Sequence, residues 1–396
     1  MTKPKQPQYR FDSFEGEWEE KELGDIVQIT MGQSPSSQNY TTNPSDYILV
    51  QGNADIKNGY VFPRVWTTQI TKQADKGDII LSVRAPVGDV GKTNYHVIIG
   101  RGVAAIKGNE FIFQILKYLK EIGYWKRIST GSTFDSISSS DIKYAKIQIP
   151  SLPEQEAIGE LFQMVDQLIQ LQDQKLATLK EQKQTFLRKM FPAQGQKVPE
   201  IRLQGFKGEW EENKLGEVSP LRGGYAFESD KFQSDGIKII RISNILSSGI
   251  IGGEFAHYHQ INNDDKYLLT GGSALIAMSG ATTGKVSILN TEEKYYQNQR
   301  VGYFMDLNKI HYNFIIAFLK SLNFNKQIQS VLVAGAQPNI SSKEIDNFQI
   351  LYPRHNVEQE AIGNFFQTLD QQISQTEEKL TELKALKQTL LNRLFV

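Results

Sequence analysis

Apolar residues recur at alternating steps of three and four through two long segments, 154–191 and 358–395. We call the row of residues at these positions a seam. The first seam consists of Ile158, Phe162, Val165, Ile169, Gln172, Leu176, Leu179, Lys183, Phe186 and Met190. The second consists of Ile362, Phe366, Leu369, Ile373, Thr376, Leu380, Leu383, Lys387, Leu390 and Leu394. A period of 3.5 residues over this length predicts two long helices that pair as a coiled coil. The alternative is that each helix packs into a domain core.

Shorter apolar runs with turn residues between them fill the segments before each helix. Strands are expected at 47–50, 78–83, 97–99, 237–242 and 274–277, and the segments 111–121 and 312–322 have helical spacing. Glycine-rich turns separate these elements. The pattern predicts globular regions of the α/β (α+β) class, each followed by one of the long helices.

The chain carries the same plan twice. GEWEEKELGDI in 14–26 returns as GEWEENKLGEV in 206–218, and both long segments begin with EQEAIG. We therefore divide the chain into an N-terminal segment, a globular region, a helix, a linker, a second globular region and a second helix, at 1–13, 14–153, 154–191, 192–205, 206–357 and 358–396. The borders of the globular regions match closely, whereas their middles diverge. Two binding modules of different specificity would show this pattern, and so would drift after an old duplication.

The repeat also predicts a topology. If the helices pair antiparallel about a pseudo-twofold axis, the N-terminal segment lies beside the end of the second helix, as the linker lies beside the end of the first. The border segments, with Trp18 and Trp210, suit an identical partner bound twice. The alternative is that each tryptophan packs inside its own domain.

Composition excludes several classes of protein. The 396 residues include 44 basic and 44 acidic side chains and no cysteine. A neutral chain is not held to nucleic acid by bulk charge, and disulfide scaffolds and cysteine-ligated metals are excluded. No signal-peptide or membrane-spanning pattern is present. We expect a cytoplasmic protein with no membrane partner.

No motif for catalysis or cofactor binding stands out. APVGDVGKT ends like a phosphate-binding loop, but Pro86 occupies the position of the first glycine and has no N–H to offer a phosphate. His257 and His259 are close in sequence, with no third ligand spaced to join them. We expect no metal, no cofactor and no catalytic residue.

Polar loops at matching places in both halves are the candidate binding residues. Arg, Gln, Asn, Ser and Thr hydrogen bond to base edges and phosphates, although such residues also form ordinary turns. Eleven basic and five acidic side chains lie between 64 and 127, which favours an anionic partner for the first half. The candidates are Gln33, Ser34, Gln51, Asn53, Arg84, Lys92, Arg101 and Thr133 in the first half, and Arg222, Tyr225, Arg241, Asn244, Ser279, Thr282, Lys285, Arg300, Gln337 and Asn339 in the second.

These motifs resemble one known family over nearly the whole chain. The repeated GEWEE borders, LSVRAPVGDVG, SGATTGKV, QNQRVG, GAQPNISSKEI and the EQEAIG helices are similar to those of the specificity subunits of type I restriction–modification enzymes. The resemblance implies two target recognition domains, each binding one half of a bipartite site in double-stranded DNA, with an antiparallel coiled coil setting their distance. It also implies two methyltransferase subunits and two restriction subunits as partners.

Two other functions are compatible with the residues themselves. The chain would be a stand-alone sequence-specific DNA-binding regulator if it bound its site without partners. It would be an enzyme of unrecognised chemistry if the lone chain cleaved or methylated DNA once cofactors were added.

Overall fold

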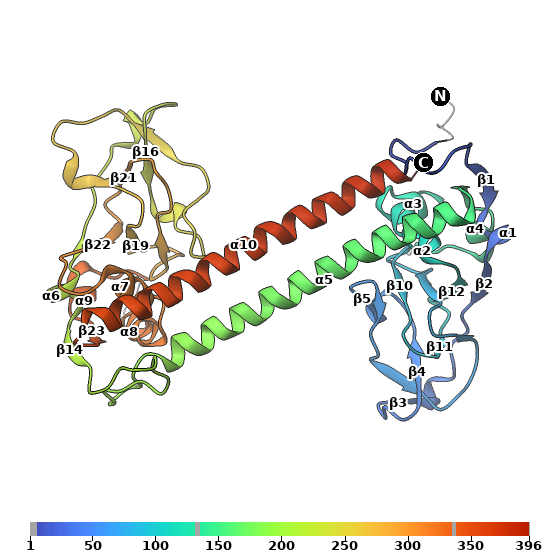
Figure 1. Ribbon diagram of the computed structural model, residues 1–396, viewed down its shortest axis with the longest axis horizontal. Coiled ribbons are helices and arrows are strands. Elements are labelled where there is room, and N and C mark those ends of the chain that lie inside the picture. Colours follow the sequence, from blue (N-terminus) through green and yellow to red (C-terminus); the bar gives the residue numbers. More distant parts are fainter. Residues whose placement is uncertain (1–5, 131–134, 335–337, 396) are drawn as a thin grey trace. The chain divides into compact units, whose positions relative to one another are not determined.

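A computed structural model describes residues 6–130, 135–334 and 338–395. The chain forms two compact units (Figure 1). Unit 1 contains Met1–Gln174 and Glu378–Val396, and unit 2 contains Lys175–Glu377. Each unit therefore combines one globular region with parts of both long helices, α5 (Leu152–Lys189) and α10 (Asn356–Leu394).

The globular region of unit 1 contains two packed sheets. One sheet has the strand order β2 (Gln28–Met31), β12 (Val103–Lys107), β9 (Ile79–Ser82), β10 (Val90–Lys92), β6 (Tyr60–Val61) and β5 (Ile56–Lys57). The other has the order β3 (Tyr40–Thr41), β7 (Val65–Thr67), β4 (Tyr47–Val50), β11 (Val97–Ile99) and β8 (Gln73–Ala74). Strand β1 (Glu19–Glu22) pairs with β13 (Lys146–Ile149), next to the start of α5. The helices α1 (Leu23–Ile26), α2 (Glu110–Glu121), α3 (Tyr124–Ile128) and α4 (Ser139–Lys143) complete the region.

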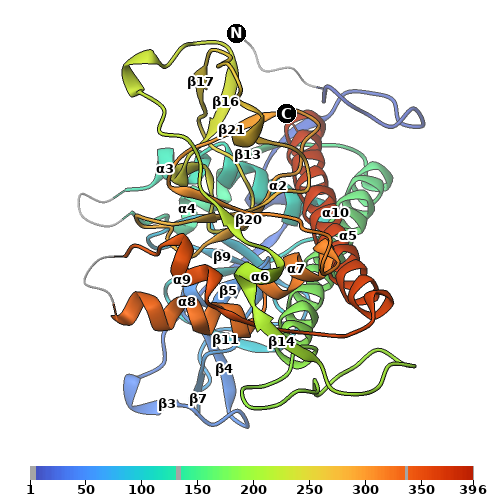
Figure 2. The ribbon, with the colours of Figure 1, turned by 90° about the vertical axis from the view of Figure 1, so that its left-hand side faces the viewer.

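Unit 2 repeats this plan with shorter sheets. One has the order β15 (Leu221–Arg222), β22 (Val301–Phe304), β19 (Ala274–Ala277) and β20 (Val286–Ile288). The other has the order β17 (Ala256–Tyr258), β16 (Ile237–Ile240), β21 (Tyr295–Gln297) and β18 (Leu268–Leu269). Strand β14 (Glu211–Lys214) pairs with β23 (Gln349–Tyr352). In Figure 2 the helices α6 (Leu215–Val218), α7 (Tyr312–Leu319), α8 (Leu322–Ala334) and α9 (Ser342–Asp346) lie away from β16, β17 and β21.

The central strand of each unit is apolar on both faces because both faces are covered. In β9, Ile79 and Leu81 pack towards α2 and α5, while Ile80 points into the core between the sheets. In β19, Ile276 packs towards the helices, while Leu275 points into the core between the sheets. Successive side chains of a strand alternate between faces, so a continuous apolar run is typical of a strand with two buried faces.

The predicted strands and helices are confirmed, with two differences in unit 2. The strand expected over 237–242 ends at Ile240, and a 3-10 helix begins at Ile242. The segment expected to form one helix over 312–322 forms α7, which ends at Leu319, and α8, which begins at Leu322. Ser321 separates the two helices, and its hydroxyl oxygen accepts a hydrogen bond from the Phe324 N–H at 3.3 Å. A serine hydroxyl that binds the first free N–H groups of a helix favours a new start at that point.

The two long helices pair antiparallel, and every residue of both predicted seams is buried or half-buried. In unit 1, Lys387 Nζ lies 2.6 Å from Asp166 Oδ1, and Lys384 Nζ lies 3.6 Å from Asp173 Oδ1. Residue numbers rise along one helix as they fall along the other, so the helices run in opposite directions. In unit 2, Lys183 pairs with Asp370 and Lys180 with Glu377, which gives the same sense.

A phenylalanine just beyond the end of each long helix packs into the globular core of the other repeat. In unit 1, Phe395 stacks on Phe162 with ring centroids 5.6 Å apart and lies 5.4 Å from the ring of Phe111. In unit 2, Phe191 lies 6.0 Å from Phe366 and 5.7 Å from Phe314. Each unit is therefore completed by a helix end from the opposite half of the sequence.

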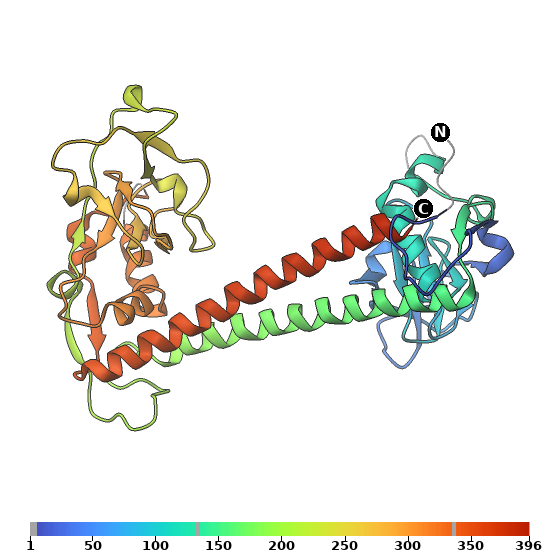
Figure 3. The ribbon, with the colours of Figure 1, turned by 45° about the horizontal axis from the view of Figure 1, so that its top comes forward.

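The N-terminal segment lies beside the end of α10, as the topology predicted (Figure 3). The Tyr9 N–H donates to the Arg393 carbonyl at 2.9 Å, and the Ile201 N–H in the linker donates to the Lys189 carbonyl at 2.9 Å. No helix in the described ranges is long and apolar enough to cross a membrane.

Candidate nucleic-acid interface

The predicted polar loops of unit 1 are joined by backbone hydrogen bonds at one end of the two sheets. The bonds run from Gln33 N to Ile99 O (2.8 Å), from Gly100 N to Val50 O (2.8 Å), from Val83 N to Gly102 O (2.9 Å) and from Ile137 N to Val83 O (3.0 Å). Loops that lie far apart in sequence are therefore held together at this end of the sheets. We call this set of bonds and the loops it joins the loop framework.

Unit 2 contains the same loop framework. Its bonds run from Tyr225 N to Gln297 O (2.8 Å), from Asn298 N to Ile240 O (3.1 Å), from Met278 N to Arg300 O (3.0 Å) and from Ile340 N to Met278 O (3.0 Å). The bridge between Arg84 and Ser136 in unit 1 corresponds to the bridge between Ser279 and Asn339 in unit 2. The prediction that polar loops recur at matching places is confirmed for the described residues.

The framework sets a residue-by-residue correspondence between the units. Gln33 corresponds to Tyr225 by its backbone bond. Gln51 corresponds to Arg241 because each directly follows the strand residue, Val50 or Ile240, whose carbonyl accepts from the opposite loop. By the bridges, Arg84 corresponds to Ser279. At each of these positions the side chains differ in size, charge or hydrogen-bonding pattern. The backbone of the loop framework is therefore the same in both units, whereas the side chains that it carries differ.

Six of the candidate side chains are exposed on these loops: Gln33, Arg84, Arg101, Lys285, Arg300 and Asn339. Half-buried candidates are Ser34, Gln51, Asn53, Lys92, Arg222, Tyr225, Arg241, Ser279 and Thr282, and Asn244 is fully buried. Thr133 and Gln337 lie outside the described residues. The exposed and half-buried loop residues are placed where they can contact a ligand.

Several candidates also have structural contacts within the loops. The Ser34 hydroxyl accepts from the Arg101 N–H at 3.2 Å, and the Gln51 side-chain amide donates to the Tyr40 hydroxyl at 2.8 Å. The Thr282 hydroxyl donates to the Ile242 carbonyl at 3.1 Å. These bonds hold loops against one another.

Lys92 and Arg222 are bound inside their units. Lys92 forms an ion pair with Glu110 on α2 and lies 5.1 Å from the ring centroid of Phe113. The Arg222 guanidinium donates to the Gln297 side-chain oxygen at 3.1 and 3.2 Å and stacks over a tyrosine ring. Burial lowers the pKa of Arg222. Both cations contribute to packing, so they are less available to a ligand than the exposed arginines.

Asn244 organises its loop from inside. Its Oδ1 accepts from the Arg241 N–H, and its Nδ2 donates to the carbonyls of Gly252 and Glu254, each at 3.0 Å. The residue in the same role in unit 1 is Asp55, whose carboxylate accepts from the Gln51 N–H at 2.7 Å. The polar residue that shapes this turn thus recurs at Asp55, two residues after the candidate Asn53.

Two framework positions escaped the sequence prediction. Gln299 is exposed and corresponds to Arg101, because Asn298 occupies the place of Gly100. Ser136 corresponds to Asn339. Aligning IIGRGV with QNQRVG so that Val103 matches Val301 would have found Gln299. The same alignment pairs Arg300 with Gly102 rather than with Arg101.

The loop that resembles a phosphate-binding motif is a tight turn that both units share. The Gly88 N–H donates to the Ser82 carbonyl, and the Gly284 N–H donates to the Ala277 carbonyl, each at 2.8 Å. Both glycines have positive φ, at 88° and 80°, which a residue with a side chain rarely adopts. Within the described ranges, no cluster of three or more His, Asp or Glu side chains is placed to hold a metal ion.

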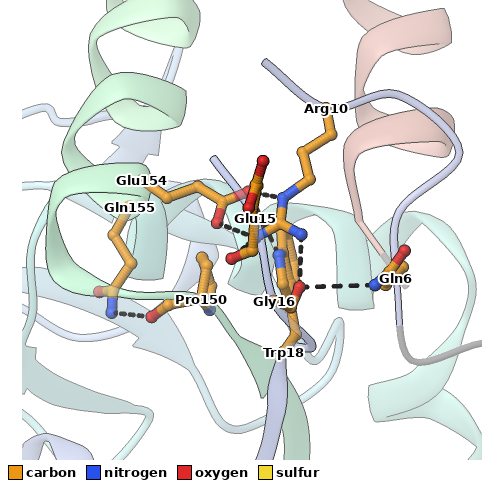
Figure 4. A network of polar contacts seen from close by, with 8 residues as sticks. All are labelled: Gln6, Arg10, Glu15, Gly16, Trp18, Pro150, Glu154 and Gln155. Carbon is orange, nitrogen blue, oxygen red and sulfur yellow. Dashed lines mark hydrogen bonds and ion pairs between the residues drawn. The ribbon is translucent and has the colours of Figure 1, made fainter. Parts of the chain in front are cut away.

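A buried carboxylate fixes the border segment of each unit, and Figure 4 shows the one in unit 1. Arg10 donates to both oxygens of Glu154 at 2.7 Å, and the Trp18 indole N–H donates to Glu154 at 3.3 Å. In unit 2, Arg202 holds Glu358 in the same way, at 2.7 and 2.9 Å. Trp18 and Trp210 are both 2% exposed. Each tryptophan therefore packs inside its own domain, and neither forms part of a free surface.

Comparison with known proteins gives one consistent family. The model of the type I restriction modification DNA specificity domain matches residues 15–181 and 207–385. The MjaX specificity subunit of a type I restriction enzyme from Methanocaldococcus jannaschii is 36% identical over 180 residues, a match that spans 43% of this chain and 42% of that one. The MjaVIII specificity subunit from the same organism is 23% identical over 96% of this chain and 92% of its own length. The crystal structure of a type I restriction–modification system S subunit from M. genitalium has a TM-score of 0.69 at 18% identity, covering 99% of each chain.

Proposed function

The chain belongs to the family of type I restriction–modification DNA specificity subunits, and on that premise we propose that each globular region binds one half of a bipartite DNA site. The observation that carries this proposal is the duplicated loop framework with different side chains. Arginine pairs best with guanine and glutamine or asparagine with adenine, so Arg241 and Gln51 at one framework position favour different bases. The two units share the same loop framework but carry different side chains on it, which suits two half-sites of different sequence.

The paired helices set the distance between the half-sites in this proposal. Helices α5 and α10 have 38 and 39 residues, and a helix of 38 residues is about 57 Å long at roughly 1.5 Å per residue. That length corresponds to about 17 base pairs of DNA. The half-site centres are expected to be closer than this. We expect them about 10 base pairs apart, where the same face of the duplex recurs.

The repeated parts away from the loops suit partners that bind twice. Strands β1 and β14 carry the matching sequences EEKE and EENK, and their glutamates are largely exposed. Two methyltransferase subunits per chain would each meet the same surface, and two restriction subunits would join them in the full complex. Native mass spectrometry with saturating methyltransferase should show two copies bound. A stable complex with only one would contradict this stoichiometry.

Methylome sequencing tests the proposed function. Cells that carry this chain with a cognate methyltransferase subunit should methylate a site made of two specified halves and an unspecified spacer, and cells that lack the chain should not. Methylation at a continuous site, or no dependence on the chain, would contradict the proposal. If the purified chain alone binds the same site with full affinity, it is instead a stand-alone DNA-binding protein.

A further inference from the structure

Two ionic triads occupy equivalent places in the two units. In unit 1, Asp166 on α5 lies between Lys387 of α10, at 2.6 Å, and Lys117 of α2, at 3.5 Å. Gln114 of α2 also donates to this carboxylate at 3.2 Å. The triad thus joins three separate parts of unit 1: the globular region, the helix that follows it, and the helix of the other repeat.

Unit 2 contains the same arrangement with the helices exchanged. Asp370 on α10 lies 2.6 Å from Lys320, directly after α7, and 2.5 Å from Lys183 of α5. Each aspartate therefore has one lysine on its own globular region and one on the opposite helix. An arrangement formed twice by residues far apart in sequence points to a shared role.

The triads account for the lysines in the two apolar seams. Lys183 and Lys387 are 22% and 15% exposed, and a buried ammonium group is costly unless it is paired. Each aspartate has a pKa below its usual value, because the attraction of its two lysines outweighs the effect of burial. The carboxylates are therefore charged at neutral pH, and each holds a lysine on either side.

Two other ion pairs between the helices are more exposed. Lys384 with Asp173 and Lys180 with Glu377 are about half exposed, at 44–55%. Each of them connects one long helix to the other. These pairs serve as matched controls, because they lie on the same helices and carry the same charges.

We propose that Lys117 and Lys320 are positioning residues that hold each DNA-binding region at one orientation on the helix pair, so that the subunit accepts a single spacer length. The inference rests on the proposed function. The apolar contacts of a globular region with its helices are non-directional. The lysine of each triad adds a directional contact to the hydrogen bonds from Asn109 to Gln155 and from His311 to Gln359, and together these restrict rotation about the helix. A region free to rotate meets the DNA groove at a slightly different position along the duplex.

The test removes only the lysine contacts from the globular regions and leaves the hydrogen bond from Gln114 to Asp166 in place. The double variant Lys117→Gln with Lys320→Gln keeps the helix-to-helix pairs of Asp166 and Asp370 intact. In complex with the methyltransferase, we expect the half-site sequences to stay unchanged. The fraction of methylated sites with a spacer one base pair longer or shorter should rise about tenfold, as expected for loss of a hydrogen bond to a charged group. The control double variant Lys180→Gln with Lys384→Gln should keep the parental spacer.

The length of the methylated spacer distinguishes a positioning role of Lys117 and Lys320 from a contribution to stability alone. The conservative variants Lys117→Arg with Lys320→Arg should restore the single spacer, since guanidinium groups can still pair with the aspartates. If the glutamine variants methylate only the parental spacer, or if the control broadens it equally, the inference is wrong. If the unaltered complex methylates no bipartite site at all, the proposed function itself fails.

Discussion

The two globular regions share the hydrogen bonds between their loops but differ in the side chains that those loops carry. Gln33, Gln51 and Arg84 in unit 1 stand where Tyr225, Arg241 and Ser279 stand in unit 2. The base of each unit shows the opposite behaviour, because Arg10 with Glu154 and Arg202 with Glu358 repeat almost atom for atom. The difference separates a constant architecture from a variable surface, as expected of a protein that binds two different DNA sequences on one scaffold.

The largest expected effect concerns the helix ends that complete each unit. Phe395→Ala should destabilise unit 1, and Phe191→Ala should destabilise unit 2, each by about 3–5 kcal/mol, because a buried aromatic ring leaves a cavity. Hydrogen exchange resolved along the chain measures this. Leu171→Ala, at a side chain 60% exposed, is the control and should change little. If Phe395→Ala loosened only unit 2, the exchanged packing of the helix ends would be wrong.

A smaller effect should distinguish the two buried carboxylates. Glu154→Gln and Glu358→Gln each leave an arginine with a weaker partner, at a cost of about 2–3 kcal/mol. The loss should be larger for Glu154, because it also accepts from Trp18, whereas the Trp210 indole N–H has no partner within the described residues. Urea unfolding of both variants measures the difference. Equal losses would mean that the indole bond contributes nothing.

The variable surface can be tested at one framework position. Arg241→Gln should reduce discrimination at one base pair of one half-site by about 1–3 kcal/mol and leave the other half-site unchanged. Gln51→Arg should alter the opposite half-site. Methylome sequencing reports both, with Lys76→Ala, at an exposed turn of unit 1, as the control. A uniform loss of methylation at all sites would indicate a structural role for these residues.

The smallest expected effect is a pH dependence of unit 1. Burial lowers the pKa of Lys117 to about 8, and this outweighs the attraction of Asp166. Between about pH 8 and the unperturbed value of 10.5, the unfolded chain binds more protons at this lysine than the folded chain does. Stability should therefore rise with pH in this window, by about 1 kcal/mol or more. Lys117→Met should remove that rise, and an identical pH profile in the variant would contradict the assignment.

Local patterns in the sequence were enough to predict the helices, the central strands and the positions of the polar loops. The spacing of the apolar residues from Ile158 to Met190 was enough to predict the first long helix. A short apolar run was enough to predict the strand that contains Leu49 and Val50. The partners of Phe191 and Phe395 were not predictable in this way, because a buried aromatic residue at a helix end does not specify which core it enters. The structure shows that each enters the core of the opposite repeat.

Residue-level roles within the loops also depended on contacts between distant segments. Asn244 is of a residue type that contacts bases, yet its side chain hydrogen bonds to backbone groups of its own loop. Arg222 is likewise enclosed by Gln297 and Leu268. Residue type predicted which loops are polar, whereas burial decides which side chains are free to contact a ligand.

An exchange of one globular region tests the central claim most directly. The segment 26–141 would be replaced by the corresponding segment of a relative with a different known half-site, and the methylome of cells with the hybrid and its methyltransferase would be sequenced. We predict that one half of the recognised sequence changes to that of the relative, while the other half and the spacer stay the same. A change in both halves together would contradict the claim that each region binds its own half-site.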